Sequence, residues 1–389
     1  MWYNQRMLKF KPTRRFNKPA IVIDVGSHSL KGLVFQSRGE DRFEIIAKKQ
    51  VKLPFIRSGF ARDENLFSRT AVKLHELIID LIRVAEDKPE RLILAMGSNA
   101  SSFHLDIWTA RLAMHGSRLS KNLLAQYFDN LKKQHLGENP SSLAFLQEID
   151  FNGHPIHIEH LWEKTFRTGD FLTLNFKVLL LETAPEMLAI FRTISETFKG
   201  IAIELIPLAL AQKKVIVKKL NIRDALLVDV GGERTLLARL KNGLLVGLKS
   251  FPLGGREFLW NIAKAAGTTC AEAEDLKKQY SQGILNKNLT PKVKKAIDDS
   301  LSIWKHKFKE SVGFLHHTGP LTENILLFGG GGRLPEIRAS LRDEWFRDFS
   351  HLDRPEVKIL GGETLFKGHT SGGEIQGPED FGLASLMLY

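Results

Sequence analysis

Two stretches of the chain, 205 residues apart, repeat one pattern of apolar and polar positions. The first, "IVIDVGSHSLKGLVF", is an apolar run that turns at Asp24 and Gly26 and resumes after a short polar tip. The second, "ALLVDVGGERTLLARL", turns in the same way at Asp229 and Gly231. Short apolar runs that are punctuated by glycine predict β-strands. The repeated unit of strand, turn and strand predicts an internal duplication.

The regions between and after these repeats predict further strands and helices. Apolar residues recur at helical spacing across 66–86, so this stretch is expected to form an amphipathic helix. The region 97–170 is less regular, which predicts an inserted subdomain. Helices are expected again at 257–280 and 290–315, and a strand that ends in four consecutive glycines follows them.

These elements predict an α/β protein with two lobes and a subdomain inserted in the first lobe. A length of 389 residues suits two or three lobes. The expected segments are a basic tail (1–18), the first lobe in two parts (19–96 and 171–220), the inserted subdomain (97–170), the second lobe in two parts (221–265 and 319–389) and a helical subdomain between those parts (266–318).

The composition is typical of a globular protein and argues against a membrane-spanning or secreted one. Apolar residues make up 43% of the chain and charged residues 26%, and no run of about 18 apolar residues suggests a spanning helix. The first residues lack the apolar core of a secretory signal. The single cysteine, Cys270, agrees with a reducing compartment. We therefore expect a cytoplasmic protein.

The formal net charge of +12 favours acidic partners, such as nucleotide phosphates, anionic lipids or acidic proteins. No zinc-finger pattern or RNA-binding signature accompanies it, so nucleic acid is disfavoured. Residues 1–16 interleave aromatic side chains such as Trp2 and Phe10 with basic ones such as Arg6 and Lys9. This composition suits an anionic membrane surface, and a disordered basic tail is the alternative.

The two Asp-x-Gly turns predict a phosphate site with a metal ion. Each turn places a carboxylate at the end of a strand, and its glycine lets backbone N–H groups approach an anion closely. Asp24 and Asp229 together can hold a hydrated Mg²⁺, which needs only one or two carboxylates besides phosphate oxygens. Lys31 can neutralise phosphate charge. The alternative is that each turn is an ordinary β-hairpin without a ligand.

The four glycines in "LLFGGGGRLPEI" lie where a strand is expected to meet a helix. Without β-carbons, this backbone can lie flat against a base or ribose, and the helix start offers unpaired N–H groups. A flexible glycine turn is the alternative.

The two phosphate turns and the glycine motif, in this order and spacing, resemble the motifs of the actin-like ATPase superfamily, most closely those of FtsA and PilM. The resemblance spans residues 20 to 389. It implies an actin-like ATPase fold: two duplicated ribonuclease-H-like lobes around a cleft that binds ATP and Mg²⁺, with residues 266–318 over the nucleotide. It implies that the cofactor contacts these residues: Asp24, Gly26, Ser27, His28, Ser29, Lys31, Asp229, Gly231, Gly232, Thr235, Gly254, Gly255, Glu274, Lys277, Gly329, Gly330, Gly331, Gly332 and Arg333.

The resemblance also implies a role in assembly. In FtsA and PilM an inserted subdomain of this kind supports subunit or partner contacts. An FtsA-like scaffold at the cytoplasmic face of the inner membrane is therefore expected, with PilM-like pilus assembly as the alternative. With either role, we expect the protein to associate with itself into dimers or filaments. We also expect it to bind a division protein or a pilus-assembly protein. A small-molecule kinase of the same superfamily is a further alternative.

The second turn and the connection between the lobes depart from the superfamily pattern. Glu233 and Arg234 stand where a glycine and a hydroxyl residue are usual, and a carboxylate there repels phosphate unless Arg234 offsets its charge. Ile206 precedes Pro207, where many FtsA proteins have a glutamate that orients the attacking water. Because hydrolysis needs that water in place, we expect ATP binding with slow or absent hydrolysis.

Overall fold

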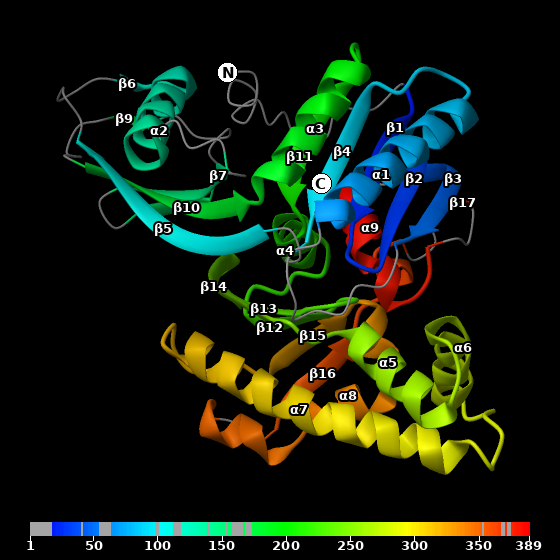
Figure 1. Cartoon of the computed structure of the whole chain (residues 1–389). Coiled ribbons are helices and arrows are strands. Elements are labelled where there is room, and N and C mark those ends of the chain that lie inside the picture. Colours follow the sequence, from blue (N-terminus) through cyan, green and yellow to red (C-terminus); the bar gives the residue numbers. More distant parts are fainter. Residues whose placement is uncertain are drawn as a thin grey trace. The chain divides into compact units, whose positions relative to one another are not determined.

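The computed structural model describes most of the chain (Figure 1). By contact, the chain separates into a smaller unit between residues 101 and 192 and a larger unit that contains 18–97 and 193–389. The expected membrane-binding residues 1–16 lie outside the described part. The described residues are 18–39, 42–53, 64–97, 101–111, 118–137, 141–151, 154–157, 166–167, 173–351, 354–366, 370–371 and 375–389.

Two sheets with the same internal topology form the larger unit, one in each lobe. The first has the order β11-β4-β1-β2-β3-β17, and the second has the order β14-β13-β12-β15-β16. In each, the central strand pairs antiparallel with the next strand along the chain and parallel with a later one. This agreement confirms the predicted duplication. The strands of the first sheet are β1 (Ala20–Val25), β2 (Ser29–Gly39), β3 (Arg42–Lys52), β4 (Arg91–Met96), β11 (Ala202–Pro207) and β17 (Thr370–Ser371); those of the second are β12 (Ala225–Val230), β13 (Thr235–Lys241), β14 (Leu244–Phe251), β15 (Asn324–Phe328) and β16 (Glu356–Ile359).

The central strands β1 and β12 carry the two predicted aspartates at equivalent places. Both strands are buried at every position except the fifth, which is Asp24 in β1 and Asp229 in β12. Strands that are covered on both faces tolerate few polar residues, so the aspartates stand out as exceptions to an apolar pattern. Each lies one residue before the end of its strand, next to the hairpin turn.

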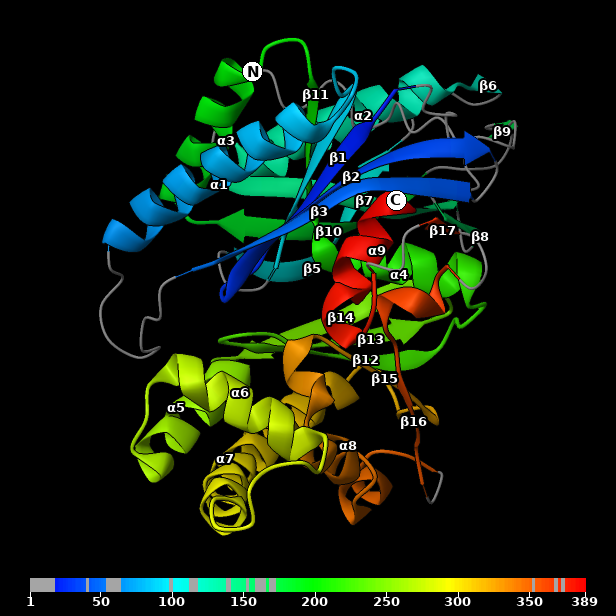
Figure 2. The same cartoon turned by 90° about the vertical axis from the view of Figure 1, so that its right-hand side faces the viewer.

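The first lobe includes the end of the chain. Helices α1 (Glu64–Val84), α4 (Leu208–Lys219) and α9 (Phe381–Met387) belong to this lobe. Leu383, Ala384 and Leu386 of α9 are buried in one core with strands β1, β2 and β4, and Figure 2 shows α9 beside α4. We expected residues 319–389 to belong entirely to the second lobe. Instead, the apolar side chains of α9 pack in the core of the first lobe.

The second lobe has one continuous core that includes its helices. Figure 1 shows that the helices cover one face of the second sheet. Val293, Trp304 and Val312 of α7 are buried in the same cluster as Val228 and Leu237 of the sheet. The expected separate subdomain at 266–318 therefore shares its core with the rest of the lobe. The helices are α5 (Gly255–Ala266), α6 (Cys270–Ser281), α7 (Thr290–His316) and α8 (Pro335–Ser340).

The smaller unit is a four-stranded antiparallel sheet, β5-β10-β7-β8, with one helix, α2 (Lys121–Leu136). Its core stacks Phe128 of α2 on Phe176, with Trp108 beside them. The inserted subdomain was expected to end at residue 170, but β10 lies at the centre of its sheet. The strands are β5 (Ser101–Arg111), β7 (Ser142–Phe151), β8 (His154–His157), β10 (Thr173–Thr183) and a small pair, β6 (Arg118–Leu119) with β9 (Phe166–Arg167).

The remaining elements are one further α-helix and four short 3-10 helices in the described part of the chain. A helix, α3 (Pro185–Thr197), follows β10 in sequence. Short 3-10 helices lie at Gly330–Arg333 (η1), Glu344–Asp348 (η2), Gly362–Thr364 (η3) and Pro378–Asp380 (η4). Within the described residues, no helix combines the length and the apolar character that crossing a membrane requires.

A buried pair of hydrogen bonds ties α7 to the second sheet. The Thr235 hydroxyl donates to the Leu253 carbonyl at 2.7 Å and accepts the Trp304 indole N–H at 3.0 Å. The variant Thr235→Val should lower the stability of the larger unit by about 2 kcal/mol, because the buried indole N–H loses its acceptor. Thermal unfolding followed by calorimetry measures the effect. Thr235→Ser keeps both bonds and should cost about 1 kcal/mol; equal losses in the two variants would contradict this role of the hydroxyl.

Candidate nucleotide-binding site

The two predicted phosphate turns lie against each other in the larger unit. A Cβ atom built on Gly232 would lie 2.6 Å from the His28 Cβ and 2.9 Å from the Ser27 Oγ, so only glycine fits there. The Glu233 backbone N–H donates to the Ser27 Oγ at 3.1 Å. The turn of each lobe therefore contacts the turn of the other directly.

The start of helix α5 holds the second turn. The Gly255 and Arg256 N–H groups each donate at 2.8 Å, to the Gly231 and Gly232 carbonyls. A Cβ atom on Gly254 would lie 2.6 Å from both of these carbonyl oxygens. The first N–H groups of a helix have no partner within the helix, and here two of them fix the turn. The glycines in "PLGGREF" thus position the second turn.

The two aspartates form the acidic centre of the site. The pKa of Asp229 is raised to about 6, mainly by burial and also by the charge of Asp24, while a hydrogen bond from Gln212 Nε2 at 3.2 Å opposes the shift. Burial also raises the pKa of Asp24, and Lys31 opposes that shift. Two neighbouring carboxylates that are costly to ionise without a cation suit a hydrated Mg²⁺. The donor set therefore fits the predicted metal.

Lys31 contacts the segment that enters α9. Its Nζ donates to the Glu379 carbonyl oxygen. The Glu379 carboxylate accepts from Arg333 Nε at 2.7 Å, and Lys48 forms an ion pair with Asp380 at 2.5 Å. The structure thus brings Lys31 and Arg333, two of the predicted ligands, to the same short segment. The lysine neutralises part of the charge at the two aspartates, as its effect on their pKa values shows.

The glycine motif lies beside the second aspartate and the start of α5. A Cβ atom on Gly329 would lie 2.4 Å from the Asp229 Oδ1, and one on Gly331 would lie 2.3 Å from the Val230 Cγ1. The Cβ position of Gly255 is 3.6 Å from the Gly331 Cα and 3.5 Å from the Lys277 Nζ. Gly329 and Gly331 therefore leave no room for a Cβ atom beside Asp229 and Val230, whereas Gly255 is in ordinary contact with its neighbours.

Lys277 and Glu274 of α6 have different environments. Burial lowers the pKa of Lys277 to about 8, against the opposing charges of Glu274 and Glu379. Glu274 instead forms an ion pair with Lys52 at 2.6 Å and lies 4.0 Å from the His28 Nε2. Lys277 therefore lies by the start of α5 near the glycine motif, whereas Glu274 joins α6 to the first lobe.

Arg256 is a site residue that sequence reasoning missed. It is 4% exposed, and its guanidinium donates to Glu233 Oε1 at 2.6 Å, His28 Nδ1 at 3.0 Å and the Leu53 carbonyl at 2.7 Å. Arg234, which we expected to offset the charge of Glu233, acts on it through its charge, while its guanidinium donates to the Ser250 hydroxyl at 2.9 Å. The sequence contains a signal for this pair: the unusual Glu233 is followed, 23 residues later, by Arg256 in the glycine-containing segment "GGREF".

The bond from Arg256 also defines the state of His28. Because the His28 Nδ1 accepts this bond, its other ring nitrogen carries the proton and faces Glu274. The pKa of His28 is lowered to about 4, mainly by burial and also by the charge of Arg256. The histidine is therefore neutral at neutral pH, and it joins Arg256 to Glu274 as part of a cross-lobe clamp, which we define as His28, Lys52, Glu233, Arg256 and Glu274.

The remaining predicted ligands have structural roles in this structure. Thr235 is fully buried in the second lobe, and its hydroxyl bonds to Leu253 and Trp304. The Ser29 hydroxyl accepts from Gln50 Nε2 at 2.9 Å. The structure thus directs these two hydroxyls to other partners. Gly26 closes the first turn, and Gly330 and Gly332 belong to η1 at the glycine motif.

The raised pKa of Asp229 predicts a pH-dependent gain in stability on its neutralisation. An ionised carboxylate that prefers to be protonated in the folded state lowers stability above its folded pKa, and this cost disappears as the pH falls below the unfolded value. Asp229→Asn should therefore stabilise the protein on the order of 2 kcal/mol at about pH 8 and not at all at about pH 4. Unfolding temperatures across this range measure the effect.

The matched control for this experiment is Asp275→Asn, because the Asp275 side chain is 71% exposed. It should leave the stability within about 0.5 kcal/mol of the wild type at both pH values. A gain for Asp229→Asn that is the same at all pH values would show that ionisation of Asp229 carries no cost.

The buried position of Arg256 predicts a large loss of stability when the cross-lobe clamp is broken. Arg256→Ala leaves the Glu233 carboxylate without its cation and should cost about 3–5 kcal/mol. The pair variant Glu233→Gln with Arg256→Met should lose less than the sum of its single variants. Lys287→Ala, at an exposed position outside the clamp, is the control and should change stability by less than about 0.5 kcal/mol. Additive effects of the two single variants would contradict the pairing.

Comparisons with known proteins agree with this geometry. No protein-family model and no curated protein matches the sequence. Among solved structures, a chain of a PilM–PilN type IV pilus biogenesis complex matches with a TM-score of 0.64 at 16% sequence identity, over 97% of this chain and 100% of the matched chain. A MamK double helical filament matches with a TM-score of 0.51 at 12% identity, over 96% and 98% of the two chains. The chain has the actin-like ATPase fold that its motifs predict.

Proposed function

We propose that this protein is a PilM-like scaffold that binds ATP with Mg²⁺ and recruits an assembly protein at the inner face of the membrane. The observation that carries the proposal is the pair of aspartates, Asp24 and Asp229, on duplicated strands of an actin-like fold. The likeness to a chain of the PilM–PilN complex along its whole length supports the PilM type over the FtsA type. The likeness to the MamK filament supports self-association into dimers or filaments.

In this proposal, the residues of both turns hold the phosphates and the metal. Asp24 and Asp229 accept hydrogen bonds from the waters of Mg²⁺, which shields the phosphate charge when bound. The backbone N–H groups of the two turns and Lys31 face the phosphates. The Glu233 N–H is donated to Ser27 in this structure, so phosphate has to replace that bond. Lys277 and the glycine motif take the nucleoside side of the cleft.

The environment of Ile206 supports binding with slow or absent hydrolysis. Ile206 is 4% exposed and belongs to the apolar core of the first lobe, so this position offers no group to orient an attacking water. General-base help of that kind contributes about 10²–10⁴-fold to a reaction rate. We infer that the nucleotide acts mainly through its binding, which holds the two lobes in one arrangement.

A titration with fluorescent ATP tests the proposal. The wild type should bind in a Mg²⁺-dependent manner, and Asp24→Asn and Asp229→Asn should each weaken binding in the presence of Mg²⁺ by about tenfold or more, since each removes one carboxylate from the metal's water shell. Asp275→Asn, which is exposed on α6, should bind as the wild type does. Absence of Mg²⁺-dependent binding, or fast phosphate release that Asp24→Asn abolishes, would overturn the proposed scaffold.

A further inference from the structure

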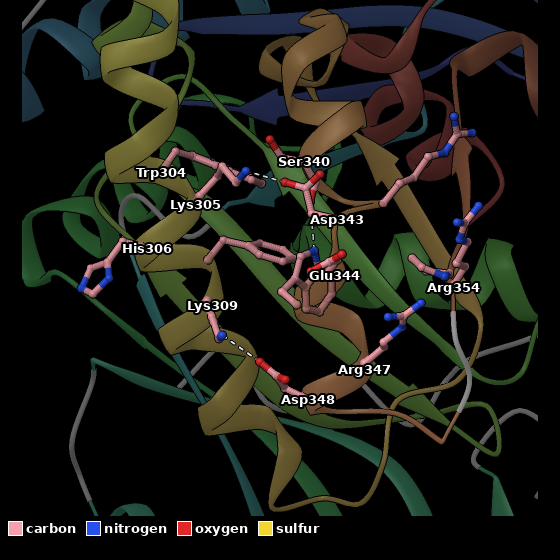
Figure 3. Close-up of a pocket in the computed structure, with 14 residues that line it drawn as sticks. Trp304, Lys305, His306, Lys309, Ser340, Asp343, Glu344, Arg347, Asp348 and Arg354 are labelled. Carbon is pink, nitrogen blue, oxygen red and sulfur yellow. Dashed lines mark hydrogen bonds and ion pairs between the residues drawn. The ribbon is translucent and has the colours of Figure 1, made fainter.

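A basic groove in the second lobe lies apart from the two turns and the glycine motif (Figure 3). Its volume is about 1010 Å³, and it lies between α7 and the segment from Ser340 to Pro355. Neither the aspartates nor the glycines of the candidate nucleotide site line it. We call it the α7 groove, and its charged lining residues are Lys305, His306, Lys309, Arg342, Asp343, Glu344, Arg347, Asp348 and Arg354.

Aromatic side chains and ion pairs give the α7 groove a fixed shape. Trp304 and Phe308 stack with their ring centres 5.0 Å apart, and Trp345 meets Phe308 edge-on at 4.9 Å. The Trp345 indole N–H donates to the Ser340 carbonyl at 2.9 Å, which fixes the ring. The walls are joined by an ion pair between Lys309 and Asp348 at 2.7 Å, and Lys305 pairs with Asp343 in the same way. Ring packing and two ion pairs thus connect α7 to the other wall of the groove.

The α7 groove has an excess of positive charge that its own carboxylates do not balance. Lysines and arginines outnumber carboxylates by five to three in its lining, and two of the three carboxylates are already paired with lysines. Arg342 and Arg354 are exposed, and within the described part of the chain neither guanidinium has an ion-pair partner. Figure 3 shows Arg354 and Arg347 on one side of the groove, away from Lys305 and Lys309. Guanidinium groups bind carboxylates through two parallel hydrogen bonds.

We propose that the α7 groove binds an acidic segment of a partner protein. Carboxylates of the segment pair with Arg342 and Arg354, and an apolar side chain packs on the exposed part of Trp345. The lining is a concave surface between α7 and one neighbouring segment, which suits a peptide chain better than a flat bilayer. Aromatic and arginine side chains are also the residue types that dominate binding energy at protein interfaces. This proposal does not depend on nucleotide binding.

Fluorescence anisotropy with the full-length chain tests the α7 groove. The probe is a short labelled peptide of glutamates and aspartates with one central phenylalanine, and the comparison probe has lysines in place of the acids. The double variant Arg342→Glu with Arg354→Glu should weaken binding of the acidic peptide by about tenfold or more, because it replaces two charge-assisted contacts by repulsion. Binding by the wild type should fall as the ionic strength rises.

The matched control is Lys292→Glu with Lys295→Glu, which makes the same change in net charge at two exposed positions of α7 outside the groove. It should bind the acidic peptide within about twofold of the wild type. Unchanged binding in the arginine variant, or equal loss in both double variants, would overturn the groove as the binding site. Tighter binding of phosphatidylserine vesicles or of single-stranded DNA than of the peptide would overturn the choice of a protein partner. Thermal unfolding of both variants establishes that they are folded.

Discussion

The arrangement of the candidate site depends on two carboxylates held near each other at the ends of the two central strands. Asp24 and Asp229 are the exceptions in otherwise buried strands, and the charge of Asp24 makes ionisation of Asp229 more costly. Such a pair persists only when a cation or a proton compensates it. The duplicated sheets, the glycines that pack around Asp229 and the contact of Lys31 with the entry to α9 all serve to hold this pair in place.

The cross-lobe clamp is a second set of contacts that joins the two lobes. Arg256 comes from the helix that holds the second turn, yet two of its acceptors, His28 and Leu53, belong to the first lobe. The buried arginine is tolerated because its three guanidinium nitrogens each donate to an acceptor and Glu233 supplies the opposite charge. The clamp therefore couples the position of the second turn to the position of the first.

Much of this fold follows from the sequence, because the duplication repeats both the apolar pattern and the two aspartates. The three motifs also locate the turns and the glycine backbone correctly. Pairings between distant residues do not follow, since Glu233 has cations at positions 234 and 256 and only the folded chain decides between them. For the same reason, the sequence does not show that α9 packs in the first lobe. Its apolar pattern predicts burial but does not say in which core.

The structure also changes the interpretation of Glu233 as a residue that repels phosphate. In the sequence this residue looks like an obstacle to phosphate, because its carboxylate stands in the second turn. In the folded chain its carboxylate bonds to Arg256, while its backbone N–H points to the first turn and bonds to Ser27. Phosphate would meet the N–H rather than the carboxylate. Because the same residue also belongs to the cross-lobe clamp, phosphate that displaces Ser27 would act directly on the contact that joins the lobes. In the function that we propose, nucleotide binding and lobe arrangement are coupled through Glu233, which suits a protein that acts by binding rather than by turnover.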